Sequence, residues 1–320
     1  MKNKNIVFFG TPEFAVSILD GLYKQDYNVT AVFTQTDKPK GRGNKVQMPP
    51  VKEYALSHGI PVYQPKTLRD EDVINVIREM KPGMIVTAAY GKIFPAELLG
   101  IPEYGCINVH GSLLPSYRGA APVQRSIING ETETGVTIMR MDVGCDTGPM
   151  IAKAGIRIPD DMNCGELFEK MGAVGSALLL DTIPGIFDGT AEYEAQDESK
   201  ATYSPKIEKS ELMLDFNKPA KELHDLIRGV YPYLVCGCYQ NTEKGKKGLR
   251  IAKTEALSYA GAEEPGTVIG ADAKSDRLTV ACGDGALRII ELIPEGKQKM
   301  KSADYIRGRQ ISVGDVLTKE

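Results

Sequence analysis

The stretch IVFFGTPEF, residues 6–14, sets a short apolar run directly before a turn and the start of a helix. Thr11-Pro12-Glu13 combines a capping residue, a proline suited to the first helical turn and a carboxylate, and an amphipathic segment follows from Phe14 to Leu22. We therefore expect a β-strand over residues 6–9 and a helix immediately after it. A strand that passes at once into a helix is the first half of a βαβ unit.

The same alternation continues outward from this stretch to residue 150. Short β-branched or aromatic runs alternate with longer amphipathic stretches, the pattern of βαβ units on a parallel sheet. The sequence predicts strands over 29–34, 62–63, 84–89, 106–109 and 134–141, and helices over 51–58, 70–80, 122–128 and 165–187. The expected fold class is therefore α/β.

The chain changes character after residue 189. Residues 190–206 are polar and have no sustained apolar period, which indicates a linker. Beyond them we expect one helix over 220–228 and short strands over 266–269, 277–282 and 286–292, separated by turns that contain glycine. These strands predict a small β-barrel. The expected organisation is an N-terminal domain over 1–189, a linker over 190–206 and a C-terminal β-barrel domain over 207–320.

Composition excludes several classes of protein. The 320 residues are 42% hydrophobic and 25% charged, as in a globular chain with an extended core. The apolar runs are too short to predict a membrane-spanning helix. The six cysteines lack paired CxxC spacing with a nearby histidine, so we expect reduced thiols in the cytoplasm and no metal site.

Nucleotide-binding motifs are also missing from the sequence. Only Gly10 is present where a dinucleotide fingerprint needs three spaced glycines, and no phosphate-binding loop of the GxxxxGK[ST] type occurs. Nicotinamide chemistry and ATP hydrolysis are therefore not indicated.

The densest polar cluster lies over residues 105–122, directly after a predicted strand. Side chains alternate across a strand, so Asn108 and His110 share one face while Ile107 and Val109 share the other. An amide can donate to an oxygen that becomes negative, and an imidazole transfers protons near neutral pH. The pair therefore suits acyl transfer. The other two histidines, at 58 and 224, are explained by solvated helical positions.

A second polar turn follows the strand predicted over 134–141. It contains Asp142 and Asp146, and Asp146 lies in a glycine-rich stretch from Gly144 to Gly148. A carboxylate that orients an imidazole or accepts a proton needs a rigid backbone, whereas Asp142 could equally cap a turn. We therefore expect Asp146 to be the third catalytic residue, although the sequence does not show that it reaches His110.

Basic residues are clustered even though the net charge is −3. The loop at 38–45 carries four cations and no acid, and it contains glycine and proline, which predicts a flexible exposed loop. Residues 207–320 carry 18 Lys and Arg against 17 Asp and Glu, with clusters over 244–253 and 297–301. Each cluster alone fits an ordinary solvated surface. Together they favour contact with an RNA backbone, in the loop through Lys38, Lys40, Arg42 and Lys45.

The sequence resembles the folate-dependent formyltransferases. The resemblance rests on Asn108-Val109-His110-Gly111-Ser112-Leu113-Leu114-Pro115, on Tyr117-Arg118-Gly119 and on Asp146-Thr147-Gly148, and it extends over essentially the whole chain. Residues 9–12, 41–43 and 119–125 point, within this family, to members that act on aminoacylated tRNA.

The resemblance implies a Rossmann-like formyltransferase domain and a C-terminal OB-like β-barrel that contacts tRNA. By family analogy the loop with Lys38, Lys40, Arg42 and Lys45 contacts the acceptor stem of the tRNA. It implies 10-formyltetrahydrofolate as the donor and the α-amino group of methionine on initiator tRNA as the acceptor. By the family pattern Asn108, His110 and Asp146 form the catalytic trio, and Ser112, Leu113, Leu114 and Pro115 line the folate site. No metal is implied, no membrane partner is expected, and we expect a monomer.

Two other functions fit parts of the same sequence. A formyltransferase for glycinamide ribonucleotide or an amino sugar nucleotide, or a hydrolase of the formyl donor, would carry the same trio. Such enzymes have no need of a cationic loop or a basic accessory barrel, which disfavours them here. A noncatalytic RNA-binding protein on a borrowed fold would not need Asn108, His110 and Asp146 together.

Overall fold

The computed structural model describes residues 3–40, 45–242 and 245–320. The chain divides into two compact units. Unit 1 comprises Met1–Pro122, Glu133–Arg157 and Phe168–Pro205, and unit 2 comprises Val123–Thr132, Ile158–Leu167 and Lys206–Glu320. Residues 190–205, expected from the sequence to be a linker, thus belong to unit 1, and two segments that precede them in the chain belong to unit 2.

Within its described residues, unit 1 is built on a seven-stranded sheet with the order β10-β9-β7-β6-β1-β2-β5. The strands are β1 (Ile6–Gly10), β2 (Val29–Phe33), β5 (Val62–Tyr63), β6 (Met84–Ala88), β7 (Cys106–His110), β9 (Glu133–Arg140) and β10 (Met150–Arg157). β1, β2, β5, β6 and β7 run parallel, as the alternating sequence predicts. The chain winds one way from β1 to β2 and β5 and the other way from β6 outward, which is the doubly wound topology.

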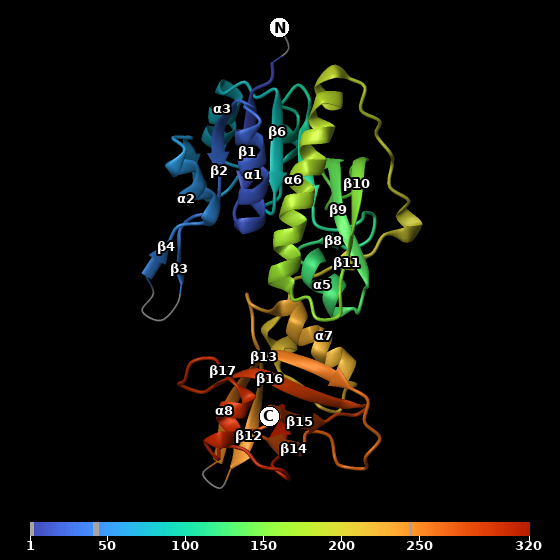
Figure 1. Ribbon diagram of the computed structural model, residues 1–320. Coiled ribbons are helices and arrows are strands. Elements are labelled where there is room, and N and C mark those ends of the chain that lie inside the picture. Colours follow the sequence, from blue (N-terminus) through green and yellow to red (C-terminus); the bar gives the residue numbers. More distant parts are fainter. Residues whose placement is uncertain (1–2, 41–44, 243–244) are drawn as a thin grey trace. The chain divides into compact units, whose positions relative to one another are not determined.

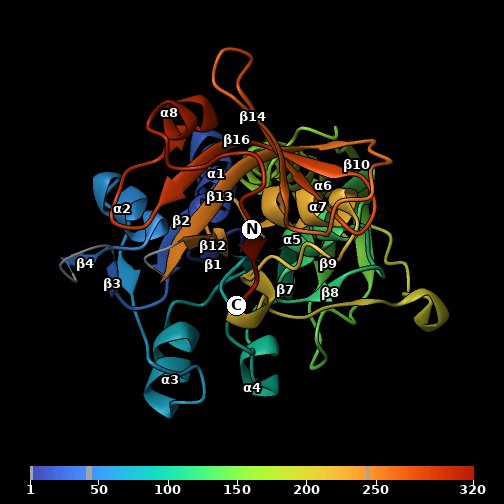
Figure 2. The same cartoon turned by 90° about the horizontal axis from the view of Figure 1, so that it is seen from below.

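Helices cover both faces of this sheet. They are α1 (Glu13–Lys24), α2 (Pro50–Ser57), α3 (Glu71–Glu79), α4 (Ala96–Leu99) and most of α6 (Cys164–Asp188). Figure 1 shows α1 and α6 in front of the strands, and the view in Figure 2 shows α3 and α4 on the opposite side. Side chains alternate between the two faces of a strand, and helices cover both faces of this sheet. Residues on either face are therefore apolar and buried, and β1 and β6 are buried at every position. Ile74 of α3 and Leu98 of α4 complete one such cluster with Phe9 and Cys106.

The edge strands depart from the expected parallel sheet. β9 pairs with β7 in the antiparallel sense, with Asn108 opposite Met139 and His110 opposite Thr137, and β10 is antiparallel to β9. The helix between β7 and β9, α5 (Pro122–Ile128), has seven residues and spans only about 10 Å. It is too short to carry the chain back along the sheet, so β9 starts near the end at which β7 finishes and must return antiparallel.

Helix α6 is long and apolar enough to match a membrane-crossing helix by length and composition alone. In this structure its apolar side is a core surface, because Met171, Leu179 and Ile183 are fully buried. A Cβ added at Gly175 would lie 3.0 Å from Val109 and 3.3 Å from Ile18, so the helix packs closely against β7 and α1. The packing explains the apolar composition without a membrane.

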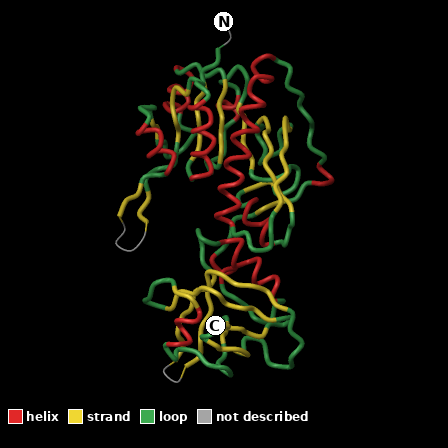
Figure 3. The backbone as a smooth tube through the Cα atoms, in the orientation of Figure 1, coloured by secondary structure: helices red, strands yellow, loops and turns green. Residues whose placement is uncertain are grey.

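Two small pairs of strands lie outside the main sheet of unit 1. β3 (Lys38–Lys40) and β4 (Lys45–Gln47) form an antiparallel ribbon where the sequence predicts a flexible loop. β8 (Arg118–Gly119) pairs in parallel with β11 (Tyr203–Ser204), which brings the end of the segment after α6 back to the residues that follow β7. A short 3-10 helix, η1 (Glu198–Lys200), precedes β11, and Figure 3 shows that most of this segment is otherwise loop.

Unit 2 is mainly antiparallel β-structure, as expected for residues 207–320. The strand order in its described part is β14-β15-β16-β13-β12-β18, and β17 pairs with β16. The elements are the helices η2 (Lys209–Leu212), α7 (Ala220–Val230) and α8 (Ser302–Arg307) and the strands β12 (Cys236–Thr242), β13 (Gly245–Leu257), β14 (Val268–Asp272), β15 (Arg277–Ala281), β16 (Ala286–Pro294), β17 (Met300–Lys301) and β18 (Leu317–Thr318).

The long strand β13 is not predicted by the sequence, because its residues stand out first as a basic cluster. Leu249 and Ile251 are buried, whereas Arg250 and Lys253 are exposed on either side of a register shift after Ile251, so this part of the cluster is the solvent side of a strand. β10 is not predicted either, although its buried Met150 and Ile156 alternate with exposed Lys153 and Arg157.

Candidate active site

Strand β7 presents the first two candidate residues. Cys106 of this strand packs in the cluster with α3 and α4, whereas Val109 packs near α6, so Asn108 and His110 share the face of Cys106. Asn108 is partly buried, and His110 is almost fully buried at the carboxyl end of the strand. This alternation is the one expected from the sequence.

Asp146 comes to these residues from the loop between β9 and β10. Its backbone has φ +56°, a left-handed conformation that L side chains seldom adopt. Gly148 follows in a crowded place, because an added Cβ would lie 2.0 Å from the Arg140 carbonyl oxygen. The glycine-rich turn therefore folds back tightly on β9 and aims the carboxylate toward β7.

The three side chains converge. The Asn108 amide Nδ2 donates to Asp146 Oδ1 at 3.4 Å, and His110 Nδ1 lies 3.7 Å from the same oxygen. The second oxygen, Oδ2, accepts a hydrogen bond of 2.9 Å from the Gly119 backbone N–H. The structure therefore brings together Asn108, His110 and Asp146, which lie in two separate parts of the sequence.

The other ring nitrogen of His110 fixes where its proton can reside. Nε2 lies 3.1 Å from the Tyr117 carbonyl oxygen, which can only accept, so Nε2 carries a hydrogen. Nδ1 is therefore the nitrogen that gains or loses a proton, and it faces Asp146. At 3.7 Å it is too far from Oδ1 for a hydrogen bond, so its hydrogen can be directed to another acceptor beside them.

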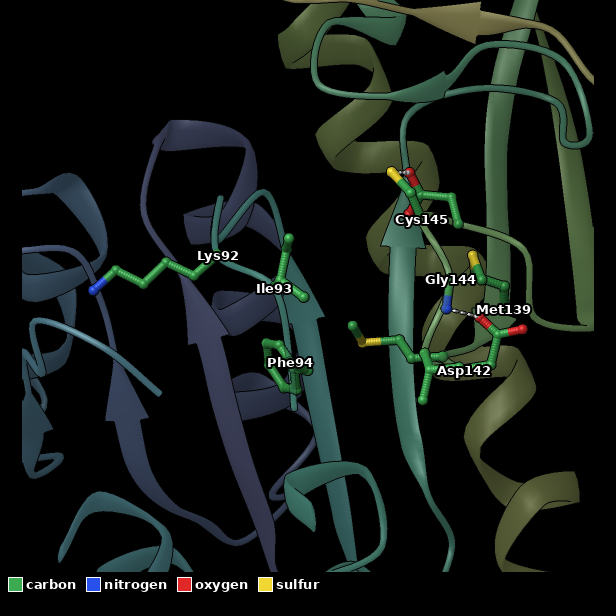
Figure 4. A pocket seen from close by; sticks show the side chains of 10 residues that line it. Lys92, Ile93, Phe94, Met139, Asp142, Gly144 and Cys145 are labelled. Carbon is green, nitrogen blue, oxygen red and sulfur yellow. Dashed lines mark hydrogen bonds between the residues drawn. The ribbon is translucent and has the colours of Figure 1, made fainter. Parts of the chain in front are cut away.

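A pocket of about 190 Å³ opens beside Asp146. Figure 4 shows Lys92, Ile93 and Phe94 of the segment after β6 on one side and residues of β9 and its loop on the other. Most of the side chains that line it are apolar: Ile93, Phe94, Met139, Met141 and Val143. Cys145 lies at the same edge, where burial and the neighbouring Asp146 carboxylate raise the pKa of its thiol, so it remains protonated.

The four residues expected to line a folate site do not line this pocket. Ser112 is fully buried and its hydroxyl donates to the Ser116 carbonyl at 2.6 Å. Leu114 is buried against Met139 and Met150. Leu113 and Pro115 are partly exposed. The segment supports the loop after β7 through Thr137, whose hydroxyl donates to the Ser112 carbonyl, and its contact with folate stays a prediction.

Three of the four expected tRNA-binding residues, Lys38, Lys40 and Lys45, belong to the β3–β4 ribbon. Lys38 is exposed and its Nζ donates to the Gln35 side chain at 2.9 Å. Lys40 and Lys45 pair with each other through the backbone of the two strands. Arg42 lies outside the described residues.

Several residues of the site are not predicted by the sequence. They are the pocket residues Lys92–Phe94, the Tyr117 carbonyl that bonds His110, and Gln196, which donates to the backbone beside Asp146. The segment from Tyr90 to Phe94 follows a buried strand, which is a signal for a ligand-binding loop in an open α/β sheet. Backbone acceptors and a contact across 50 residues leave no such signal in the sequence.

Comparison with known proteins identifies two family models in the chain. Residues 4–183 match the formyl transferase model, and residues 206–310 match the model of the formyl transferase C-terminal domain. Solved structures show the same fold. A sugar 3N-formyl transferase, WlaRD, crystallised with dTDP and 5-N-formyl-THF, has a TM-score of 0.63 and 20% identity over 93% of this chain and 100% of its own. HypX from Aquifex aeolicus in complex with tetrahydrofolic acid has a TM-score of 0.66 and 13% identity over 98% of this chain and 48% of its own.

Similarity to curated sequences is much higher. Methionyl-tRNA formyltransferase of Ruminiclostridium cellulolyticum is 45% identical over 98% of this chain and 99% of its own length. The Bacillus subtilis enzyme of the same name is 44% identical over 98% of this chain and 97% of its own. The chain belongs to the formyl transferase family and, within it, to the methionyl-tRNA formyltransferases.

Proposed function

We propose that this enzyme takes its formyl group from 10-formyltetrahydrofolate and transfers it to the α-amino group of methionine esterified to initiator tRNA. The observation that carries the proposal is the convergence of Asn108, His110 and Asp146 beside a pocket within a chain that matches methionyl-tRNA formyltransferases over its full length. The cytoplasmic location and monomeric state expected from the sequence are consistent with this role and stay predictions.

The pocket suits one ring system of the donor. Pockets that enclose a whole drug-sized ligand are roughly 300–1,000 Å³, so a pocket of about 190 Å³ is large enough for a pterin ring rather than for an entire folate. Ile93 and Phe94 on one side and Met139 and Val143 on the other offer apolar surface to a flat ring. Asp142 and Asp146 are the acidic residues among those that line it. The residues present therefore fit the folate donor.

Asn108 and His110 are the groups that stabilise negative charge. The bound donor supplies a formyl carbon that an amine can attack. The Asn108 amide nitrogen carries a second hydrogen besides the one directed at Asp146, and protonated Nδ1 of His110 points into the same space. Both donate to the formyl oxygen as it gains charge, in a largely buried place where such hydrogen bonds are strong.

Asp146 has two tasks. Its carboxylate accepts hydrogen bonds from the Gly119 N–H and the Asn108 amide, which orient it toward His110 Nδ1. From this position it stabilises the protonated imidazole. It also accepts, directly or through water, the proton that the attacking amine loses. The bond between the formyl carbon and N10 of the folate then breaks, and N10 takes up a proton as tetrahydrofolate leaves.

Basic surfaces supply the contact with tRNA. Lys38, Lys40, Arg42 and Lys45 in and around the β3–β4 ribbon would contact phosphates of the acceptor stem. The solvent face of β13, with Arg250 and Lys253, would add backbone contacts from unit 2. Phosphate contacts position the acceptor and do not themselves read its sequence.

The proposal is tested by offering the enzyme competing acceptors. The protein is incubated with 10-formyltetrahydrofolate carrying a labelled formyl group and with methionyl initiator tRNA, methionyl elongator tRNA or glycinamide ribonucleotide. We expect label on the initiator tRNA in preference to the other two. Transfer to glycinamide ribonucleotide with none to either tRNA, or label released as formate alone, would refute the proposal.

A further inference from the structure

The segment 190–205 follows α6 in the chain. It contacts the backbone near Tyr117, whose carbonyl accepts from His110, and the backbone of the turn that carries Asp146. We call it the strap. Its first contact is a backbone bridge, in which Met150 and Glu194 exchange N–H···O bonds of 2.8 Å at the start of β10. Its last part, β11, pairs with β8. The strap is therefore attached both to the end of the turn that carries Asp146 and to the segment that follows His110.

Gln196 is the side chain of the strap that holds the Asp146 turn. Its Nε2 donates to the carbonyl oxygens of Asp146 and Gly148, each at 2.7 Å. Both carbonyls belong to the turn between β9 and β10, and Asp146 itself has a left-handed φ of +56°. A conformation of this kind persists only where the surroundings hold it. The two hydrogen bonds from the Gln196 amide stabilise the turn in this conformation.

Arg118 fixes Gln196 in turn. Its side chain is fully buried, and Nε and Nη2 donate to Gln196 Oε1 at 3.0 and 2.9 Å. Since the guanidinium can only donate, it selects the amide orientation in which Gln196 Nε2 faces the two carbonyls. Glu198 accepts from the outer side of the guanidinium at 2.7 Å, which raises the pKa of Arg118 and keeps it charged.

The same strap supports His110 through Tyr117. The Tyr117 carbonyl, which accepts from His110 Nε2, also accepts from the Ser204 hydroxyl at 3.1 Å, and the Tyr117 N–H donates to Thr202 Oγ1 at 2.8 Å. Tyr117 too has a positive φ, of 61°. Both backbone turns that orient the catalytic side chains are thus held by one segment.

We propose that Gln196 is a positioning residue of the formyl transfer reaction, which sets the Asp146 carboxylate relative to His110 while Arg118 fixes its amide. The inference rests on the proposed function for its kinetic consequence only. A shift of about 1 Å in a catalytic group can lower the rate about a hundredfold, so loss of this hold is expected to affect the chemical step more than substrate binding.

Gln196→Glu is the sharpest test, because it keeps the size of the side chain and an oxygen for Arg118 but sets a carboxylate oxygen against two carbonyls. We expect kcat to fall about 10- to 100-fold, with the KM for tRNA and for folate within about threefold of wild type. Gln196→Met, which adds no charge, is expected to lower kcat similarly. Glu198→Gln is the matched control, since it keeps an acceptor for Arg118 and leaves the Gln196 bonds in place, and it is expected to stay within about twofold of wild type.

A second measurement does not depend on activity. The Gly119 amide donates to Asp146 Oδ2, so a displaced carboxylate should speed hydrogen exchange at Gly119 in both Gln196 variants while the melting temperature stays near that of wild type. Unchanged kcat and unchanged exchange in Gln196→Glu would overturn the inference. A fall in kcat together with the melting temperature and with faster exchange throughout unit 1 would also overturn it, in favour of general destabilisation. Faster exchange at Gly119 in an enzyme that formylates no tRNA would refute the proposed function and leave the positioning role standing.

Discussion

At the scale of single residues, the proton on His110 decides what the site can do. Because Nε2 donates to the Tyr117 carbonyl, only Nδ1 changes its protonation, and it does so within 3.7 Å of Asp146. A neutral Nδ1 would face the carboxylate with a lone pair, whereas a protonated Nδ1 faces it with a hydrogen. Only in the protonated form does Nδ1 carry a hydrogen that it can donate to the formyl oxygen.

Replacement of His110 tests this role. His110→Ala removes a charged donor from a buried site, so we expect formyl transfer to fall by at least about a hundredfold. Affinity for tRNA, measured by filter binding, is expected to remain near that of wild type because the phosphate contacts lie elsewhere. Turnover equal to that of wild type would remove His110 from the mechanism.

His224, expected from the sequence at a solvated helical position, is instead buried and bears on stability. It is buried between Thr254 and the Asp160 carbonyl, and burial lowers its pKa below the ordinary value of 6.5, with Arg228 and Lys221 adding to the shift and the Asp160 carbonyl and Asp225 opposing it. The unfolded chain therefore binds a proton at a higher pH than the folded chain does. The contribution of neutral His224 to the free energy of unfolding is fully present above pH 6.5. It falls as the pH drops from 6.5 toward the lowered pKa of His224 in the folded state.

The corresponding measurement is urea unfolding of wild type and His224→Asn at about pH 7.5 and about pH 5.5. We expect the variant to be less stable at the higher pH and to lose less stability than wild type between the two values. Equal losses in both proteins would show that His224 does not titrate in this way.

The two residues of β7 could be predicted because strand alternation is a local property. Asn108 and His110 lie two positions apart, so a strand places them together whatever the rest of the fold does. The convergence with Asp146 could only be hypothesised, since it depends on a loop that folds back across β7. The role of Gln196 could not be predicted, because it depends on two backbone carbonyls 50 and 48 residues away.

At the scale of elements, the turn between β9 and β10 determines the geometry of the site. Arg140 N–H donates to the Pro149 carbonyl, which closes the turn and starts the β10 pairing. Asp142 supports the inside of the turn by accepting from the Gly144 N–H at 2.9 Å and from the Thr147 hydroxyl at 2.6 Å. The capping role considered for Asp142 on sequence grounds agrees with these bonds.

Gly148→Ala tests how tightly this turn is packed. The added Cβ would lie 2.0 Å from the Arg140 carbonyl oxygen, a backbone atom that cannot move without disturbing β9. We expect a loss of about 1–3 kcal/mol of stability and a fall in kcat, measured by thermal unfolding and formyl transfer. Gly100→Ala is the control: its Cβ would lie 3.7 Å from its nearest neighbour at an ordinary helical φ of −87°, so little change is expected there. Equal stability of the two variants would contradict the packing argument.

The parallel strands and their helices were predictable because each leaves a local pattern of its own. The reversal at β9 was not, since it follows from the length of α5 relative to the strands and not from the pattern of β9. The strap has the sequence of a linker because its polar side chains, Gln196 and Glu198 among them, have the composition of a solvated segment. In the structure they accept hydrogen bonds from the buried Arg118. This contact joins residues about 80 positions apart, so no local pattern predicts it.

At the scale of the whole molecule, the chain combines a catalytic unit with basic surfaces. The net charge is −3, so binding of a polyanion depends on local clusters and not on the overall charge. Phosphate contacts release counterions, and tRNA affinity should therefore fall steeply with added salt.

Arg42→Ala tests the loop within this picture. If Arg42 contacts one phosphate, its loss should reduce the slope of log affinity against log salt by about 0.7–0.9 and raise the KM for tRNA more than that for folate. Lys24→Ala serves as a control, since Lys24 lies at the far end of α1 from the carboxyl edge of the sheet and pairs with Asp20. Equal changes in both KM values would argue against the loop assignment.

The most direct test of the account is a single-turnover reaction. Enzyme in excess is mixed with methionyl initiator tRNA and labelled 10-formyltetrahydrofolate, and N-formylmethionyl-tRNA is followed over time for wild type and for Asp146→Asn, which keeps the shape of the side chain but removes its charge. The account predicts rapid transfer by wild type and at least about a hundredfold slower transfer by the variant with both substrates bound. Transfer at the wild-type rate in Asp146→Asn would contradict it.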